Sequence, residues 1–119
     1  MMRLLIGACM ASALLLSCTE APASEPVARG RQVYRALDCG RCHQIAGEGA
    51  RLGPELTNIG TVAAARVPGV TAEEYLRQSI VSPSAYVVRG YPDTMPHGLQ
   101  LGLSAADLDA LIAYLASLR

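Results

Sequence analysis

The chain has 119 residues, with ten basic and ten acidic side chains, so its formal net charge at pH 7 is zero. The length favours one small domain. The balanced charge excludes the basic footprint that nucleic-acid binding requires, so we expect no nucleic-acid partner. Phe and Trp are absent and five tyrosines are the only aromatic residues. A domain this small therefore needs something beyond its own side chains, such as an apolar cofactor, to complete its core.

Residues 1–17 have the features of a lipoprotein-type signal peptide. Arg3 supplies a positive charge, and residues 4–16 form an apolar run that suits a signal peptide and is short for a membrane span. The following "LLSC" resembles a bacterial lipobox, which predicts cleavage before Cys18 and lipidation of that cysteine. Cleavage after Ala23 or an uncut anchor are the alternatives. Each predicts export, and we expect a protein lipid-anchored in the periplasm or on the outer face of the cell membrane.

Residues 18–26 are predicted to be the lipidated N-terminus and a flexible tether, because they are small, polar and proline-containing. The folded domain is predicted over residues 27–119. Its first helix should run roughly from Pro26 to Leu37, since proline suits a first helical turn and the apolar residues that follow recur at helical spacing.

A Cys-x-x-Cys-His motif follows this helix, formed by Cys39, Cys42 and His43. A zinc site would need about four ligands, yet the chain has no second cysteine pair and only one other histidine, His97. A thioredoxin-like dithiol follows a strand, whereas the segment before Cys39 is predicted to be helical. The third alternative is haem attachment, in which both thiols form thioethers and the histidine binds iron. The sequence favours this one, with a single covalent haem c attached through Cys39 and Cys42.

A second helix is predicted within "TAEEYLRQSI", which begins at Thr71. Thr71 and Glu74 match a capping box, in which each side chain bonds the other residue's backbone N–H. Strand signals are scarce after this helix, and "YVV" at residues 86–88 is the best of them.

The loop "GYPDTMPHG" contains Met95, which is the only methionine outside the signal segment and lies 52 residues after His43. A six-coordinate electron-transfer haem needs a second axial ligand, and methionine opposite histidine raises the reduction potential. A methionine that merely fills a core gap is not expected in a polar, proline-flanked loop. Met95 is therefore the predicted distal ligand. His97 is the alternative, although an exposed loop histidine is its more ordinary interpretation.

The third helix is predicted over "SAADLDALIAYLASLR", with Ser104 as its N-cap and Arg119 at its C-terminal end. Its leucines and isoleucine recur at helical spacing and form one apolar stripe. With three helices and few strand signals, the predicted fold class is all-α.

The chain resembles the class I mono-haem cytochromes c over residues 27–119. The resemblance rests on "GRQVY", "CGRCH", "LGPEL", "SPSAYVVRGYPDTMP" and "LIAYL". In that family a Gly-x-x-x-aromatic motif on the first helix crosses a Leu-x-x-aromatic motif on the last, and here the matching residues are Gly30, Tyr34, Leu111 and Tyr114. The resemblance implies a small helical cytochrome c fold wrapped around one haem.

The resemblance also implies roles for residues near the haem. In "LGPEL" the Pro54 carbonyl would accept a hydrogen bond from the His43 imidazole, and Leu56 would pack on the haem; the alternative for Pro54 is a plain turn proline. The candidates for contacts with the haem propionates are Tyr86, Tyr91, Arg51 and Arg89. Core aromatic residues and solvated arginines are the alternative interpretations of these four.

We therefore expect a one-electron carrier that acts as a membrane-tethered shuttle in a respiratory or periplasmic redox chain. Redox partner proteins would be its donor and acceptor, and it would be a monomer or a subunit of a complex. With balanced charge, a small and partly apolar docking patch around the haem edge is expected. One alternative is a non-catalytic cytochrome subunit of a larger membrane oxidoreductase. Another is a haem peroxidase or sensor with an open iron site, against which Met95 argues.

Overall fold

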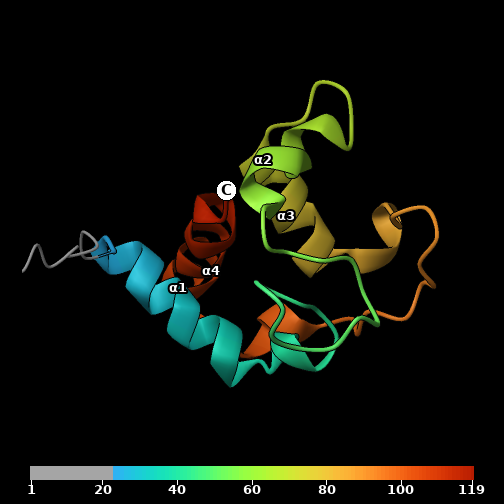
Figure 1. Ribbon diagram of the computed structural model, residues 1–119. Coiled ribbons are helices and arrows are strands. Elements are labelled where there is room, and N and C mark those ends of the chain that lie inside the picture. The colour runs from blue at the N-terminus through green and yellow to red at the C-terminus, as the bar shows by residue number, and fades with distance from the viewer. Residues whose placement is uncertain (1–22) are drawn as a thin grey trace, which may run out of the picture.

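The computed structural model describes residues 23–119, which form four α-helices joined by irregular segments and short 3₁₀ turns (Figure 1). The predicted signal peptide, Cys18 and most of the tether lie outside the described residues. The α-helices are α1 (Glu25–Ala36), α2 (Ile59–Val62), α3 (Ala72–Val81) and α4 (Ala105–Ser117), and the turns are η1 (Cys39–Arg41), η2 (Ala63–Ala65), η3 (Pro83–Ala85) and η4 (Leu99–Gly102).

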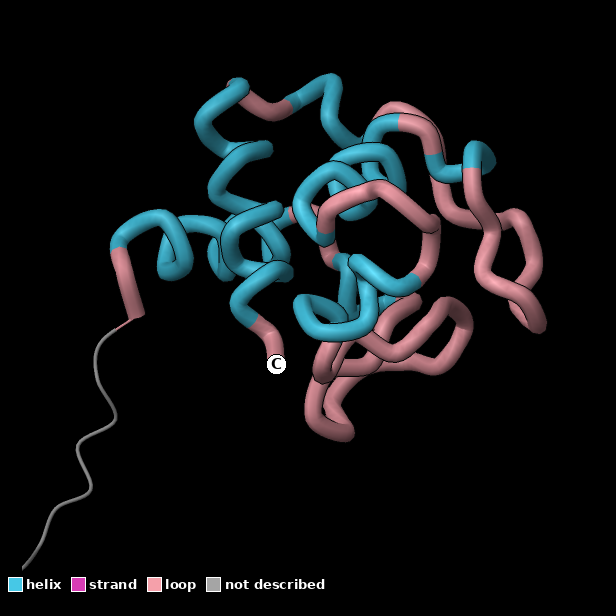
Figure 2. The backbone as a smooth tube through the Cα atoms, turned by 90° about the horizontal axis from the view of Figure 1, so that it is seen from above, coloured by secondary structure: helices cyan, strands magenta, loops and turns pink. Residues whose placement is uncertain are grey.

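The all-α class is confirmed, because residues 23–119 contain no strand. The segment at residues 86–88, which has the strongest strand signal, pairs with nothing as a strand. No helix in the described part of the chain combines the length and apolar character needed to cross a membrane. The tube in Figure 2 shows the long loops gathered on the side of the molecule away from the N-terminal end.

The helix starts follow the capping signals of the sequence. Pro26 lies in the first turn of α1, as predicted. At α3 the full capping box forms: the Glu74 N–H donates to Thr71 Oγ1 at 3.2 Å, and the Thr71 N–H donates to Glu74 Oε2 at 2.9 Å. At α4 the Asp107 N–H donates to the predicted N-cap Ser104 Oγ at 3.1 Å. Local hydrogen bonds therefore set where α3 and α4 begin.

The end of α4 differs from the prediction, which extended the helix to Arg119. The helix ends at Ser117, and Leu118 adopts an extended conformation. The carbonyl of Leu118 accepts a hydrogen bond from the Gly60 N–H at 2.8 Å, which joins the end of α4 to α2. A tertiary hydrogen bond thus holds Leu118 outside the helix that it would otherwise have continued.

Helices α1 and α4 cross at the predicted glycine and aromatic positions. Gly30 is buried so closely against α4 that a Cβ atom there would lie 1.9 Å from the Ala110 carbonyl oxygen and 2.6 Å from Tyr114 Cβ. Beside it the rings of Tyr34 and Tyr114 meet edge to face, with centroids 5.7 Å apart. The predicted crossing is confirmed, and it depends on the absence of a side chain at Gly30.

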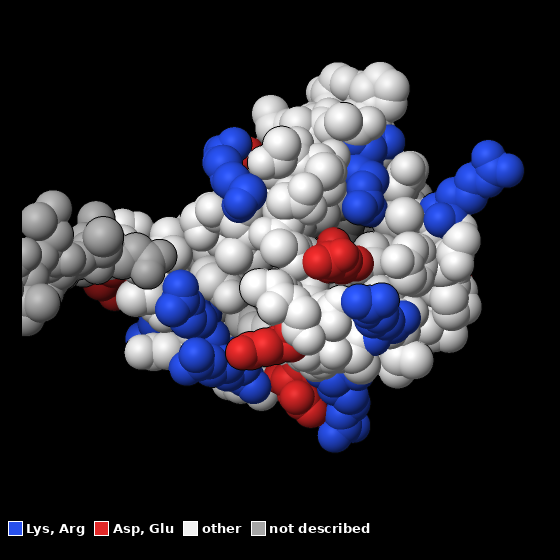
Figure 3. Space-filling model, in the orientation of Figure 1, with Lys and Arg blue, Asp and Glu red and all other residues white. Residues whose placement is uncertain are grey.

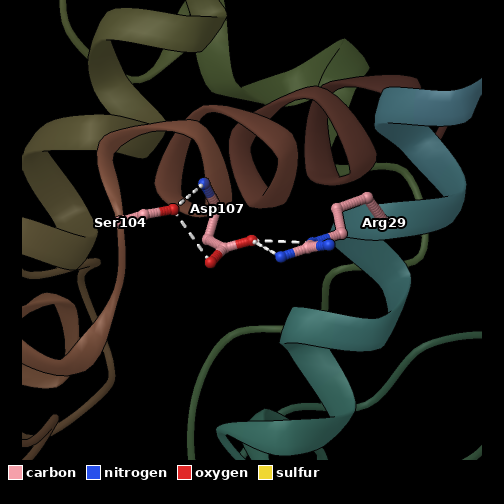
Figure 4. A network of polar contacts seen from close by, with 3 residues as sticks. All are labelled: Arg29, Ser104 and Asp107. Carbon is pink, nitrogen blue, oxygen red and sulfur yellow. Dashed lines mark hydrogen bonds and ion pairs between the residues drawn. The ribbon is translucent and has the colours of Figure 1, made fainter.

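A polar network closes the solvent-facing side of the same crossing (Figure 4). Asp107 on α4 accepts a hydrogen bond from Ser104 Oγ at 2.9 Å and pairs with Arg29 on α1 at 2.6 Å. The Ser104 hydroxyl, followed by the Arg29 guanidinium, holds the pKa of Asp107 below its usual value of 3.8. Because the folded-state pKa is lowered, the contribution to stability is present at neutral pH and is lost as the pH falls through that pKa.

The Gly30→Ala substitution should destabilise the protein by about 3 kcal/mol, because the methyl group has no room unless α1 and α4 separate. Thermal unfolding of the holoprotein measures the effect. Gly102→Ala is the matched control, since a Cβ at Gly102 meets no atom within 4 Å. Equal melting temperatures for the two variants would contradict the close approach at Gly30.

Candidate cofactor site

The described residues enclose a cavity of about 590 Å³ whose lining comes from all four α-helices and from the loops between them. Its walls are mainly apolar, and Ile59 and Leu111, the two most deeply buried large side chains, belong to both the core and the cavity wall. The seven residues predicted to bind the cofactor all line it: Cys39, Cys42, His43, Pro54, Leu56, Tyr86 and Met95. The fold therefore brings together residues up to 56 positions apart in the sequence.

The two cysteines lie on a tight turn that directs both thiols to the cavity. Asp38, two residues after the end of α1, adopts the left-handed conformation, with φ of 53°. The Cys42 and His43 N–H groups then both donate to the Cys39 carbonyl, at 3.1 and 3.0 Å. The thiols are half-buried and not joined by a disulfide. This turn therefore allows both thiols to reach one edge of a group bound in the cavity.

The chemistry of these thiols argues against the other two uses of the motif. Burial, supported by the negative charge of Asp38 and the neighbouring Cys42, raises the pKa of Cys39 to about 11. Redox-active dithiols need a lowered pKa, so that one sulfur is a thiolate at neutral pH. Across residues 23–119, no group of three or more Cys, His, Asp or Glu side chains is arranged to hold a metal ion.

The His43 ring is fixed by its neighbours on both sides. Its Nδ1 lies 2.7 Å from the Pro54 carbonyl oxygen, so Nδ1 carries the proton and donates it in a hydrogen bond. In the neutral ring this arrangement puts the lone pair on Nε2, as a metal ligand requires. Gly53 packs against the ring so closely that a Cβ there would lie 2.6 Å from Cε1. The structure thus contains the hydrogen bond that the resemblance implies for Pro54.

The segment from His43 to Leu56 is held in place by backbone hydrogen bonds. The Gly53 N–H donates to the Cys42 carbonyl and the Leu56 N–H donates to the Gln44 carbonyl, both at 2.8 Å. These bonds bring "LGPEL" back beneath the cysteine turn. Leu56 is half-buried, packs on the core and also lines the cavity.

Met95 and its rival His97 have different surroundings. Met95 is half-buried and lines the cavity, whereas His97 is exposed, lies outside the lining and has its Nε2 3.0 Å from Ser84 Oγ. Of the two candidates, only Met95 is in a position to reach a group bound in the cavity. The chain between α3 and η4 that carries both residues is the orange loop of Figure 1.

The candidates for propionate contacts divide into three groups. Tyr86 and Tyr91 line the cavity. Arg51 lies in an adjoining pocket of about 160 Å³, which Tyr91 also lines, and donates to Gln44 Oε1 at 2.9 Å. Arg89 is exposed and lines neither space.

The sequence interpretation missed Arg66, which is half-buried and lines the cavity. Its guanidinium donates to the Tyr75 hydroxyl at 3.2 Å, lies over the Tyr75 ring at 5.8 Å, and forms no ion pair with the described acidic residues. A partly buried cation beside an apolar cavity is suited to an anionic group of a ligand. Arg66 follows the short elements α2 and η2, which leave no periodic signal in the sequence.

The residues of the cavity fit a covalently bound haem. Apolar walls suit the porphyrin, two thiols at the expected spacing suit its vinyl groups, and Arg66 suits a propionate. The free Nε2 of His43 and the sulfur of Met95 suit the iron. An apolar group of this size also completes a core that has no Phe or Trp.

Comparison with known proteins gives the same assignment. A sequence profile of the family described as Cytochrome c matches residues 27–119. Cytochrome c oxidase subunit 2 of Alkalihalophilus pseudofirmus is 33% identical over 104 residues, which cover 84% of this chain and 28% of that protein. The chain thus spans less than a third of the length of this relative. On the profile match, the chain belongs to the cytochrome c family, whose members carry electrons on a covalently bound haem c.

Proposed function

We propose that this protein is a membrane-tethered one-electron carrier whose haem c is attached through Cys39 and Cys42 and ligated by His43 and Met95. The observation that carries the proposal is the shared cavity, to which the Cys-x-x-Cys-His turn and the distant Met95 both contribute. When bound, the haem supplies reversible one-electron chemistry at its iron. The protein's own residues hold the ligands, exclude water and present an edge to partners.

His43 is proposed as the proximal ligand through Nε2. The hydrogen bond from Nδ1 to the Pro54 carbonyl fixes the tautomer and the ring orientation, and it makes the imidazole more basic. Gly53 contributes by lacking a side chain, since any Cβ would push the ring away from Pro54. The orientation of the His43 ring would thus be the same for ferrous and ferric haem iron, which favours fast electron transfer.

Met95 is proposed as the distal ligand through its thioether sulfur. A neutral, polarizable sulfur raises the reduction potential relative to a second imidazole. The apolar walls around it, to which Leu56 and Leu111 belong, exclude water and have the same effect on the potential. Arg66, with Tyr86 and Tyr91, is proposed to hold the propionates.

The exposed part of the cavity rim is proposed as the docking surface for redox partners. Leu52, Val87 and Tyr91 line the cavity and are also among the exposed large apolar side chains, with exposures of 64%, 38% and 38%. Figure 3 shows acidic and basic side chains interspersed on one face rather than gathered by sign. Docking would therefore depend on a small apolar contact more than on steering by net charge.

A second candidate function is a separate cytochrome subunit of a larger membrane oxidoreductase. The similarity to part of a protein named cytochrome c oxidase subunit 2 favours it, because there the matching segment belongs to a much longer chain. The two functions share the same haem site and the same proposed lipid anchor. They differ in whether the protein stays bound to its partner.

The Met95→Ala substitution should abolish the sulfur-to-iron charge-transfer band of the ferric protein and lower the reduction potential by roughly 100 mV or more. It should also allow carbon monoxide to bind rapidly to the ferrous protein. Absorption spectroscopy and redox titration measure these changes. His97→Ala is the control and should leave the band in place; a band that survives in Met95→Ala would refute the proposed ligand.

The Gly53→Ala substitution should displace the His43 ring and weaken its hydrogen bond to Pro54, because the new methyl group overlaps Cε1. We expect a lower stability of the folded holoprotein, by about 2 kcal/mol, and a shifted reduction potential. Denaturant unfolding and redox titration measure the two effects. Gly102→Ala should change neither, and a Gly53→Ala protein with the wild-type potential would contradict a proximal role for this contact.

The Cys18→Ala substitution should release the protein from the membrane fraction, because it removes the proposed lipidation site. Fractionation and the intact mass of the native protein measure this, since the mass reports both lipid and haem.

Mild crosslinking before solubilisation separates the two functions: one stable partner indicates a subunit, and none indicates a shuttle. Unchanged membrane attachment in Cys18→Ala would refute the lipid anchor.

A further inference from the structure

Two residues that flank Met95, Asp93 and His97, are both hydrogen-bonded to Ser84, which lies outside the loop. Ser84 Oγ donates to Asp93 Oδ1 at 2.9 Å, and His97 Nε2 lies 3.0 Å from the same oxygen. The Ser84 hydroxyl has one hydrogen, which it donates to the Asp93 carboxylate. The Nε2–H of His97 therefore donates to Ser84 Oγ. Asp93 is two residues before Met95 and His97 is two residues after it.

These two bonds are the main polar attachment of the loop. Within the described chain, the only other hydrogen bond from residues 91–97 to the rest of the protein is that of the Tyr91 N–H to the Val88 carbonyl, in an adjoining turn. The bond from the Thr94 N–H to the Pro92 carbonyl lies inside the loop. Pro92 and Pro96 have no N–H to donate. Apart from the bonds to Ser84, hydrogen bonds to the rest of the described chain therefore contribute little to holding the loop.

Ser84 itself belongs to a fixed part of the fold. It lies in η3, directly after Pro83, which is buried and lines the cavity. The Ala85 N–H closes this turn by donating to the Ser82 carbonyl at 2.9 Å, and Ser82 caps the end of α3. The serine hydroxyl thus connects an irregular loop to the turn that follows helix α3 of the core.

We propose that Ser84 is a positioning residue that pins the Met95 loop on both sides of the methionine and so limits how often the loop opens. The inference rests on the proposed ligation by Met95. Opening the loop far enough to withdraw the sulfur breaks both bonds of Ser84. Loss of the hydroxyl therefore raises the rate at which the distal position becomes accessible, while the closed arrangement and the ligand itself stay the same.

The test is the binding of imidazole to the ferric holoprotein in stopped flow. At saturating imidazole the observed rate is limited by departure of the methionine sulfur. We expect Ser84→Ala to raise this limiting rate by about tenfold, the effect of one or two net hydrogen bonds. Ser84→Thr, which keeps the hydroxyl, should restore a rate near that of wild type.

Ser82→Ala is the matched control, since Ser82 directly precedes η3, is also exposed, and its side chain forms no hydrogen bond to the described residues. It should bind imidazole at the wild-type rate. A limiting rate in Ser84→Ala within twofold of wild type would overturn the inference. So would an equal acceleration in Ser82→Ala.

Two further measurements separate this inference from the proposed ligation. Met95→Ala should bind imidazole without the slow limiting step; if wild type binds as fast as Met95→Ala, ligation by Met95 fails and the inference fails with it. A slow wild type, a fast Met95→Ala and an unchanged Ser84→Ala refute only the pinning. Amide hydrogen exchange at Thr94, Met95 and His97 should be faster in Ser84→Ala than in Ser82→Ala, and equal exchange would contradict the role of Ser84.

Discussion

The hydrophobic core of this chain is arranged around a cavity instead of around large side chains of its own. Without Phe or Trp, the helices bring leucine, isoleucine, valine and tyrosine to a common centre that still contains about 590 Å³. Ile59 and Leu111 are buried by the helices on one side and face the cavity on the other. Burial of apolar surface against the cofactor is thus part of the folding free energy. The positions of α1, α3 and α4 and the fit of the haem depend on each other.

The two proposed iron ligands are supported in different ways. His43 belongs to a segment closed by backbone hydrogen bonds, and its ring is confined by Gly53 and the Pro54 carbonyl. Met95 belongs to an irregular loop with two prolines, whose polar attachment is the side chain of Ser84. Backbone bonds persist through most substitutions, whereas a side-chain attachment is removed by a single one. The distal side is therefore where the chain can tune ligand exchange without disturbing the fold.

Two features of the structure bear on how electrons would enter and leave. The apolar rim at Leu52, Val87 and Tyr91 is small, and weak redox complexes typically bury less than about 1,200 Å². The charges on the face in Figure 3 are mixed in sign, so that face offers no strong long-range attraction for a charged partner. Such a surface suits brief encounters near a membrane, where the proposed tether would supply a high local concentration, and equally suits a fixed position beside a larger partner.

The sequence alone determined the features that depend on local chemistry. The Cys-x-x-Cys-His spacing predicts haem attachment and the proposed proximal ligand, and Met95, the only methionine outside the predicted signal peptide, is the proposed distal ligand. The capping residues Thr71 and Ser104 specify where two helices begin. The crossing of α1 and α4 was also predictable, because Gly30 and Tyr34 match the Gly-x-x-x-aromatic motif of the family that the chain resembles.

Only the tertiary structure decided that Arg66 lines the cavity, where α4 ends and what holds the Met95 loop. Arg66 is placed by the short elements α2 and η2, which are too brief to leave a periodic pattern. Leu118 leaves the helix because its carbonyl accepts a hydrogen bond from Gly60, which lies 58 residues away in the sequence. Ser84, Asp93 and His97 look like ordinary surface residues in the sequence. Their connection exists because the fold returns the loop to the end of α3, and contacts between distant segments carry no local signal.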